Sequence, residues 1–161
     1  PVLIHTPHRD KLTGTKRTID LIREVNIDEN MVIIDHLNEQ TLPLVLETDC
    51  WRGHSIYPDT KMSEERMVIL LKEYGMEKMV VNSAADWGCS DPLKVPKTAA
   101  VMKLAGFSEQ DISLVLYRNP VNFFAQSGRI SLEELEQGVR VDQTQLWKNN
   151  SALRGQDPIV E

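Results

Sequence analysis

Every histidine of the chain lies at or just past the end of an apolar, strand-like segment: His5, His8, His36 and His54. A fourth apolar segment, KMVVNSA, leads into Asp86. Because the carboxyl ends of parallel strands meet at one edge of a sheet, these side chains would converge there. Two neutral imidazoles and a carboxylate form a ligand set that suits Zn²⁺ or a similar divalent ion. Such an ion activates water, and Asp86 could then accept the proton.

Each of these residues, taken alone, has a plainer explanation. A single histidine near a strand end is more often a hydrogen-bonded structural residue than a ligand. An aspartate that follows Ala84 and Ala85 is more often a turn residue. The convergence of several such residues on one edge of a sheet is what favours a site.

Strand-like segments begin near residues 1, 31, 51 and 78, and helical patterns lie between them. The clearest helix runs from Ser63 to Tyr74 and stops at Gly75. Further helices are expected over 16–25, 38–49, 95–104 and 109–124, with a short capped helix after Ser131.

This alternation of strands and helices predicts a parallel sheet and an α/β fold. The spacing is close to the roughly 31 residues per unit of an eight-unit barrel of about 250 residues, so four units would make half a barrel. A four-stranded doubly wound sheet fits the spacing almost as well. However, no Gly-rich phosphate loop such as G-x-G-x-x-G is present to support it.

Composition narrows the classes of protein and partner. The 161 residues suffice for one domain, and 41% of them are hydrophobic, which allows a core. A net charge of −6 argues against a nucleic-acid footprint, and no apolar run suggests a membrane partner. Cys50 and Cys89 form no C-x-x-C pair, which favours a reducing, cytoplasmic setting. The opening Pro1 suggests the C-terminal part of a longer protein.

Four segments in order, PVLIHTPH, MVIIDHLNEQT, GHSIYPDTKMS and VNSAADWGCSDP, resemble the C-terminal half of a TatD-like metal-dependent hydrolase of the amidohydrolase superfamily. The resemblance covers roughly residues 1–128 and implies four βα units of a (β/α)₈ TIM barrel with parallel strands. Residues 129–161 would form a short polar C-terminal extension with one short helix.

The resemblance also implies a ligand set. His5 and His36 would be metal ligands from successive strands, and Asp86 would be the carboxylate of the last strand. The family's His-x-His on the first strand and its Glu or Lys on the fourth are not in the chain. The remaining ligands of one or two divalent ions, Zn²⁺ or similar, would therefore lie upstream.

Two carboxylates near these ligands are expected to stay out of the site. Family members often carry Glu-Thr-Asp around the final carboxylate, but the Glu47-Thr48-Asp49 triplet of this chain falls one strand too early. Asp49 is therefore interpreted as a turn residue. Alternation along the strand would point Asp35 to the face opposite His36, toward the helices rather than the metal.

Substrate-side residues are expected on the loops that follow the strands: His8, Glu39, His54, Lys61 and Trp87. Lys61 could meet an anionic group, and Trp87 could form a wall of the pocket. Glu39 could instead orient His36 or cap the next helix, and His54 could equally be packed in the core.

The sequence leaves three functions open. The first is a metal-dependent hydrolase whose activated water attacks an ester, amide or phosphoester bond of a small-molecule substrate. The second is a degenerate barrel that binds a metabolite or a partner without turnover. The third is an inactive half-barrel. Four strands leave two open edges, so we expect either the missing N-terminal half-barrel or self-association.

Overall fold

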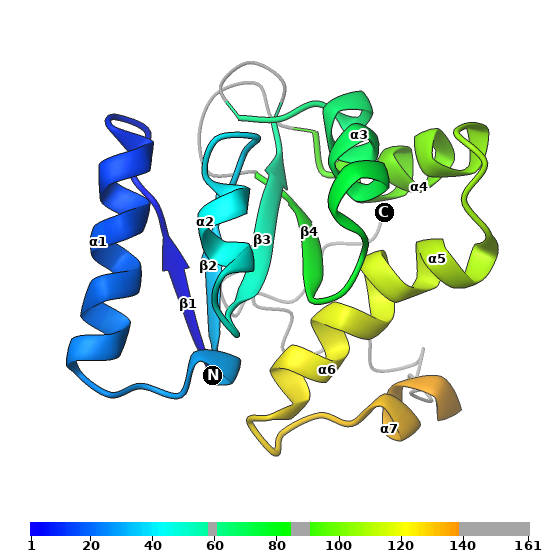
Figure 1. Ribbon diagram of the computed structural model, residues 1–161. Helices are drawn as coiled ribbons and strands as arrows, with labels where there is room; N and C mark the ends of the chain where they lie inside the picture. Colours follow the sequence, from blue (N-terminus) through cyan, green and yellow to red (C-terminus); the bar gives the residue numbers. More distant parts are fainter. Residues whose placement is uncertain (58–60, 85–90, 139–161) are drawn as a thin grey trace, which may run out of the picture.

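Four parallel strands form a single sheet in the order β1-β2-β3-β4 (Figure 1). The structure is a computed structural model that describes residues 1–57, 61–84 and 91–138. The strands are β1 (Val2–His5), β2 (Val32–Asp35), β3 (Trp51–Ile56) and β4 (Met79–Ser83). All of them point the same way, so their carboxyl ends share one edge. The predicted α/β fold with four parallel strands is confirmed.

Helices follow each strand. They are α1 (Lys11–Glu24), α2 (Leu42–Leu46), α3 (Glu64–Tyr74), α4 (Lys94–Leu104), α5 (Glu109–Ser113), α6 (Asn119–Ala125) and α7 (Leu132–Gln137). A 3₁₀ turn, η1 (Glu29–Met31), precedes β2, and a π-helical stretch, η2 (Leu114–Arg118), joins α5 to α6. The helix predicted over 109–124 is therefore continuous in the chain but changes its winding at η2.

Helix ends follow the expected capping chemistry. The Ser63 hydroxyl accepts a hydrogen bond from the backbone N–H of Arg66 at the start of α3. Gly75, at φ 81°, ends that helix in a conformation that glycine adopts without strain. Ser131 caps α7 in the same manner. The helix predicted over 38–49 is shorter, and Pro43 occupies its first turn.

The main core lies between the sheet and the helices that cover one of its faces. It combines buried side chains of α1, β2, α2, β3, α3, β4, α4 and η2: Ile22, Ile34, Leu42, Ile56, Met67, Met79, Met102 and Val115 among others. The continuous apolar runs of β2 and β4 reflect burial on both faces of the sheet.

A smaller cluster lies on the other face of the sheet. Phe123 of α6 is fully buried there against Ile33 and Val80, with Trp51 packed at the edge. The side-chain amide of Asn119 donates hydrogen bonds to the carbonyls of Met76 and Met79, which fixes α6 to the start of β4. This inner face is the one that a closed barrel would turn inward.

The sheet has an exposed edge at β1. Val2 is 43% exposed and Leu3 is 39% exposed, whereas all four residues of β2 are buried. No helix in the described ranges is long and apolar enough to cross a membrane. Helix α7 lies within the predicted C-terminal extension, but residues 139–161 lie outside the described residues. A division of the chain near residue 128 stays a prediction.

Candidate metal centre

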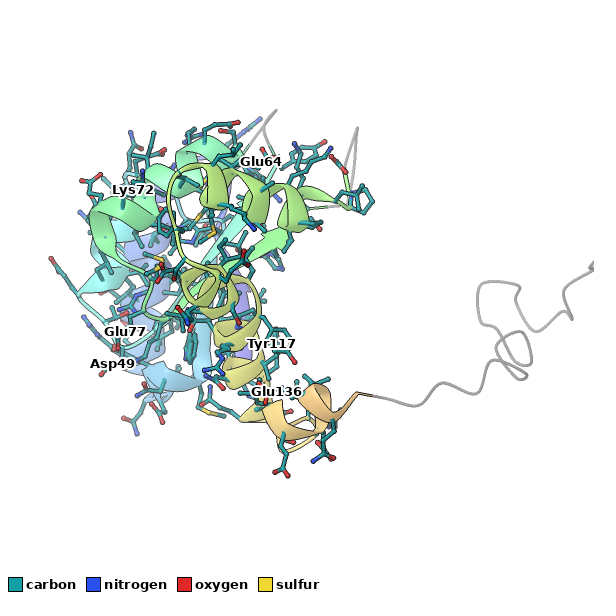
Figure 2. The ribbon with its side chains drawn as sticks, turned by 90° about the vertical axis from the view of Figure 1, so that its right-hand side faces the viewer. Asp49, Glu64, Lys72, Glu77, Tyr117 and Glu136 are labelled. Carbon is teal, nitrogen blue, oxygen red and sulfur yellow. The ribbon has the colours of Figure 1, made fainter. Side chains whose placement is uncertain are left out.

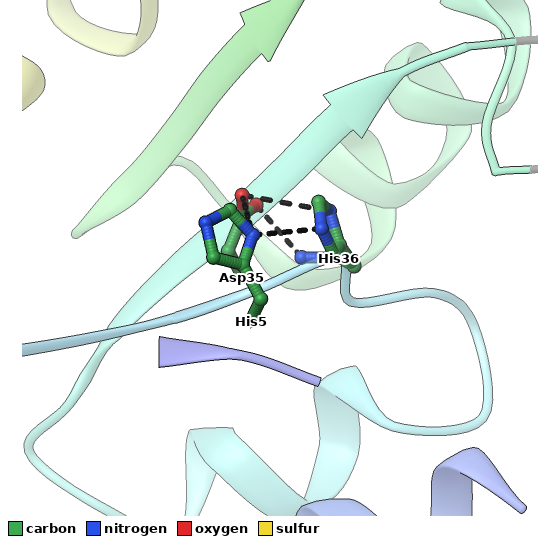
Figure 3. Close-up of side chains that lie close together, drawn as sticks. All are labelled: His5, Asp35 and His36. Atoms are coloured by element: carbon green, nitrogen blue, oxygen red, sulfur yellow. Dashed lines mark hydrogen bonds and ion pairs between the residues drawn. The ribbon is translucent and has the colours of Figure 1, made fainter. Parts of the chain in front are cut away.

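His5, Asp35 and His36 meet at the carboxyl edge of the sheet (Figure 3). Nδ1 of His5 lies 2.8 Å from Nε2 of His36. One carboxylate oxygen of Asp35 lies 3.7 Å from Nδ1 of His5 and 3.5 Å from Nδ1 of His36. One ligand atom from each residue can be chosen so that all lie within 4.8 Å of one another. Two imidazoles and a carboxylate at such separations match the donor set of a divalent metal site.

A backbone reversal at His36 brings Asp35 and His36 to the same side. β2 ends at Asp35, and His36 adopts a left-handed conformation with φ 65°. Its N–H donates a 2.7 Å hydrogen bond to the Asp35 carboxylate. The prediction that Asp35 points away from His36 was wrong, because strand alternation no longer applies once the chain leaves the extended conformation.

Two polar residues of the next strands surround Asp35. Ser55 of β3 and Asn82 of β4 are neighbours in the strand register. The Asn82 amide donates to both carboxylate oxygens of Asp35 at 3.2 Å. The Ser55 hydroxyl lies 2.7 Å from Oδ1 of Asn82 and 2.8 Å from Nδ1 of His36. The sequence prediction missed Asp35, Ser55 and Asn82, although polar residues within apolar strands were a visible signal.

Gly53 leaves room for this arrangement. A β-carbon at this position would lie 2.8 Å from Oδ1 of Asp35 and 2.9 Å from its Cα atom. Contacts this short do not occur between real side chains and backbone, so β2 or β3 would have to shift. The absence of a side chain at Gly53 therefore allows Asp35 to lie against β3.

Burial keeps the His36 imidazole neutral. Loss of solvation lowers the pKa of His36 from 6.5 to about 4. The Asp35 carboxylate opposes this shift, while the positive charge of Lys61 adds to it. A neutral imidazole is the form that offers a lone pair to a metal ion.

The centre opens into a cavity of about 550 Å³ lined by His5, Asp35, His36, Ser55 and Asn82, together with loop residues that include His8 and Lys61. A neighbouring hollow of about 740 Å³ shares His8 and Lys61 and adds Lys11, Asn38 and Gln40 among its lining residues. Both volumes are within the range of small-molecule sites.

Two lysines line these hollows: Lys61 lines both of them and Lys11 lines the larger one. The Lys11 ammonium donates a hydrogen bond to the carbonyl of His36 at 2.5 Å. Burial and the nearby charge of Lys61 lower the pKa of Lys11, and the Asp35 carboxylate opposes them. Within the described ranges, neither Lys11 nor Lys61 forms an ion pair with a carboxylate.

The other predicted site residues fall in different places. His8 lies over His36, with the ring centroids 6.0 Å apart and nearly parallel, and Lys61 lines both hollows. Glu39 instead pairs both carboxylate oxygens with the Arg66 guanidinium, at 2.8 and 2.6 Å. The structure places Glu39 in this surface ion pair and not against His36.

His54 lies in the core, which is one of the two places that the sequence left open for it. His54 is fully buried on the helix-facing side of β3, because it alternates with Ser55, which faces the cavity. Its Nδ1 donates to the Arg52 carbonyl at 3.2 Å. Its Nε2 has no hydrogen-bond partner among the described residues. Asp86 and Trp87 lie outside the described residues, so their placement stays a prediction.

Asp49 lies at the other end of the sheet. It precedes β3, and its side chain is 75% exposed. Figure 2 labels Asp49 beside Glu77 and far below Glu64, which belongs to the carboxyl-edge side of α3. The Glu-Thr-Asp triplet is therefore remote from the histidine cluster.

Comparisons with known proteins bear on this geometry. No family model matches the chain. An uncharacterised metal-dependent hydrolase of Methanocaldococcus jannaschii is 29% identical over 124 residues, which is 77% of this chain and 49% of that protein. The crystal structure of a TatD-like protein from Archaeoglobus fulgidus matches with a TM-score of 0.58 and 24% identity, over 76% of this chain and 46% of that one. The chain resembles the TatD-like metal-dependent hydrolases.

These comparisons confirm the resemblance that the sequence motifs indicated. The fold is that of part of a TatD-like protein. The chain spans about half the length of the relatives it matches, which agrees with the prediction of a half-barrel.

Proposed function

We propose that the chain is the C-terminal half of a metal-dependent hydrolase of the TatD-like type. The observation that carries this proposal is the pair of facing imidazole nitrogens of His5 and His36, 2.8 Å apart, beside the buried Asp35 carboxylate. They lie at the carboxyl edge of a parallel sheet, where chemistry is placed in barrels of this kind.

The residues present fit a divalent ion such as Zn²⁺. Two imidazoles and one carboxylate supply three borderline-hard donors in reach of one another. His5 and His36 would hold the ion. The carboxylate ligand would be Asp86, as the sequence predicts, or Asp35, which lies beside the two histidines. Any further ligands, and a second ion, would depend on residues outside this chain.

A bound divalent ion supplies a Lewis acid and a water of lowered pKa. The residues of this chain would then accept the proton and position the metal ligands. Asp86 would accept the proton from the attacking water, and Asp35 would hold His36 through its backbone N–H. The bond cleaved would be an ester, amide or phosphoester.

His8 and Lys61 are our candidates for substrate contact. Both line the cavity of the metal centre and the neighbouring hollow. Lys61 and Lys11 bring two positive charges, and within the described residues neither is matched by a carboxylate. Two such charges favour a substrate with an anionic group. Trp87 would form part of the wall, as the sequence predicts.

The missing half of the barrel is the proposed partner of this chain. β1 is an edge strand whose Val2 and Leu3 are substantially exposed. An exposed apolar edge is a template for another strand. An upstream half-barrel would cover β1, and without it we expect self-association of the chain.

A comparison of two aspartates in the full-length protein tests the hydrolase. Asp86→Asn should lower the turnover of a cleavable ester or phosphoester by about 10²–10⁴, because an amide cannot accept the proton. Asp49→Asn should leave turnover unchanged, since Asp49 is exposed at the opposite end of the sheet. If Asp49→Asn abolishes activity and Asp86→Asn does not, the assignment of Asp86 as the catalytic carboxylate is wrong. Absence of cleavage with any added divalent metal would favour a non-catalytic, ligand-binding barrel.

A further inference from the structure

A chain of hydrogen bonds runs from Asp35 through two neutral side chains to the ring of His36. The Asn82 amide lies 3.2 Å from both oxygens of Asp35. Oδ1 of Asn82 lies 2.7 Å from the Ser55 hydroxyl, which in turn lies 2.8 Å from Nδ1 of His36. Both His36 and Asp35 are buried, so these groups satisfy one another rather than water.

The donor and acceptor groups allow only one direction for these hydrogen bonds. A carboxylate only accepts, so the group of Asn82 that faces Asp35 must be its NH₂. Turning the amide over would set Oδ1 of Asn82 against the carboxylate, with no proton between two acceptors. The Asn82 oxygen therefore faces Ser55 and accepts the single hydroxyl proton of Ser55 at 2.7 Å. The Asp35 oxygens are longer-range acceptors of the same proton, at 3.3 and 3.4 Å, and they leave the Ser55 oxygen with only lone pairs as well.

Ser55 then has only lone pairs left for His36. At 2.8 Å from Nδ1 of His36, the Ser55 oxygen must accept, so Nδ1 must carry the proton of the neutral ring. The lone pair of that ring is consequently on Nε2, the nitrogen that faces His5 and the cavity.

We propose that Ser55 is a positioning residue that, with Asn82 behind it, holds His36 as the Nδ1–H tautomer and keeps the Nε2 lone pair directed at a cation. This inference rests on the proposed metal site for its purpose, but the tautomer itself follows from the side-chain network alone. Outer partners of this kind fix the ring that binds the metal in many sites.

The Asp35 carboxylate is a competing explanation within the same site. One of its oxygens lies 3.5 Å from Nδ1 of His36, beyond ordinary hydrogen-bond length but close enough to favour the same tautomer. The shorter contact to Ser55 is the stronger of the two. A test must therefore separate the serine from the carboxylate.

Nitrogen-15 NMR of the intact, metal-free protein labelled at the histidine ring nitrogens gives the tautomer directly. Signals of His36 are identified by their loss in His36→Gln. Wild type should show a single Nδ1–H tautomer at neutral pH. Ser55→Ala removes the acceptor at Nδ1 and should show a mixture of tautomers. Asn82→Leu leaves the Asp35 oxygens, at 3.3 and 3.4 Å, as acceptors of the serine proton, so it should change the tautomer less than Ser55→Ala does. Ser55→Thr keeps the hydroxyl and should restore the single form.

Ser83→Ala is the matched control, because Ser83 also lines the cavity at the end of β4 but its hydroxyl has no hydrogen bond within the described ranges. It should leave His36 unchanged. An Nε2–H ring in wild type, or a pure Nδ1–H ring in Ser55→Ala, would overturn the inference, the latter assigning the role to Asp35.

Zinc titration separates this inference from the proposed function. Ser55→Ala should weaken Zn²⁺ binding by about 10–100-fold, as loss of an outer partner does, and Ser55→Thr should recover most of it. If Zn²⁺ fails to bind the wild type while the tautomer behaves as expected, the metal site falls and the positioning role of Ser55 stands. If Zn²⁺ binds equally well to Ser55→Ala, Ser55 does not position the ligand.

Discussion

The two ends of the same sheet face are made of different residues. At the amino end, Phe123 and Trp51 pack edge to face, with ring centroids 5.6 Å apart, and the Trp51 indole donates to the Asn30 carbonyl. At the carboxyl end, polar side chains replace them: Asp35, His36, Ser55 and Asn82.

On each strand, the change from packing residues to polar residues takes place between one residue on this face and the next. On this face Ile33 is followed by Asp35, Gly53 by Ser55 and Val80 by Asn82. Inward residues two apart are separated by only about 6.6 Å along a strand. Packing and chemistry are therefore neighbours on one surface, and yet different residues carry them. Mutations at the two ends should have separable effects.

The largest effect is expected at the apolar end. Phe123→Ala should lower the free energy of unfolding by about 3–5 kcal/mol, because a fully buried ring is lost and Ile33, Val80 and Trp51 cannot fill its place. Urea denaturation measures this loss. Phe124→Ala should cost much less, since Phe124 is 41% exposed.

Under conditions where Phe123→Ala remains folded, its Zn²⁺ affinity should equal that of wild type. A large fall in affinity would mean that the two ends of the face are mechanically coupled, and the comparison would fail.

Lowering the pH should destabilise the fold through His54, in the carboxyl-end half of β3. Burial lowers the pKa of His54 from 6.5 to about 4, since a second proton on its ring would lie at Nε2, which has no hydrogen-bond partner in the described part of the chain. Above pH 6.5 the ring is neutral in both states and adds no pH dependence. As the pH falls from 6.5 to 4 the unfolded chain takes up the proton first, so the free energy of unfolding falls by about 3 kcal/mol from this residue.

Urea denaturation at several pH values measures the slope. His36, whose pKa is lowered in the same direction, adds to it. His54→Leu should flatten the curve between pH 6.5 and 4. An unchanged slope in that variant would show that the acid sensitivity comes from other groups.

The two candidate ligands should differ in their effect on metal affinity. His36 is buried and held by hydrogen bonds on two sides, whereas the His5 side chain is 64% exposed. His36→Ala should weaken Zn²⁺ binding by at least the 10–100-fold that loss of an outer partner costs. His5→Ala should weaken it less, since its exposed ring is held by one hydrogen-bond contact, to His36. Isothermal titration calorimetry compares them, and the opposite ranking would contradict the proposed role of the network.

The smallest effect is expected on the surface of the carboxyl end. Glu39→Gln breaks an ion pair with Arg66 whose side chains are 44% and 43% exposed. Exposed pairs contribute about 0–1 kcal/mol, so stability and Zn²⁺ affinity should both stay close to wild type. A marked loss of Zn²⁺ affinity would show that Glu39 acts in the metal centre, as the sequence predicted.

Sequence patterns were sufficient for the elements and for part of the site. Apolar runs and helix caps predicted all four strands, and the position of His5 and His36 after two of them predicted their approach. The approach of Asp35 to His36 could not be predicted in this way, because the left-handed turn at His36, which brings both side chains to one face, leaves no mark in the pattern of apolar residues. The sequence left His54 open between cavity and core for a related reason. A histidine within a strand faces the cavity or the helices according to register, and the strand-end pattern does not fix the register.

Gly53 limits which variants of this fold can keep the centre. A methyl group there would meet the Asp35 carboxylate at 2.8 Å and Ile33 at 2.9 Å. Even alanine would have to push β2 away from β3, and every group tied to Asp35 would move with it. In a saturation library selected for Zn²⁺ binding, position 53 should be as intolerant as the ligands themselves. The evolutionary freedom of the site is thus restricted by a residue that contributes no functional group.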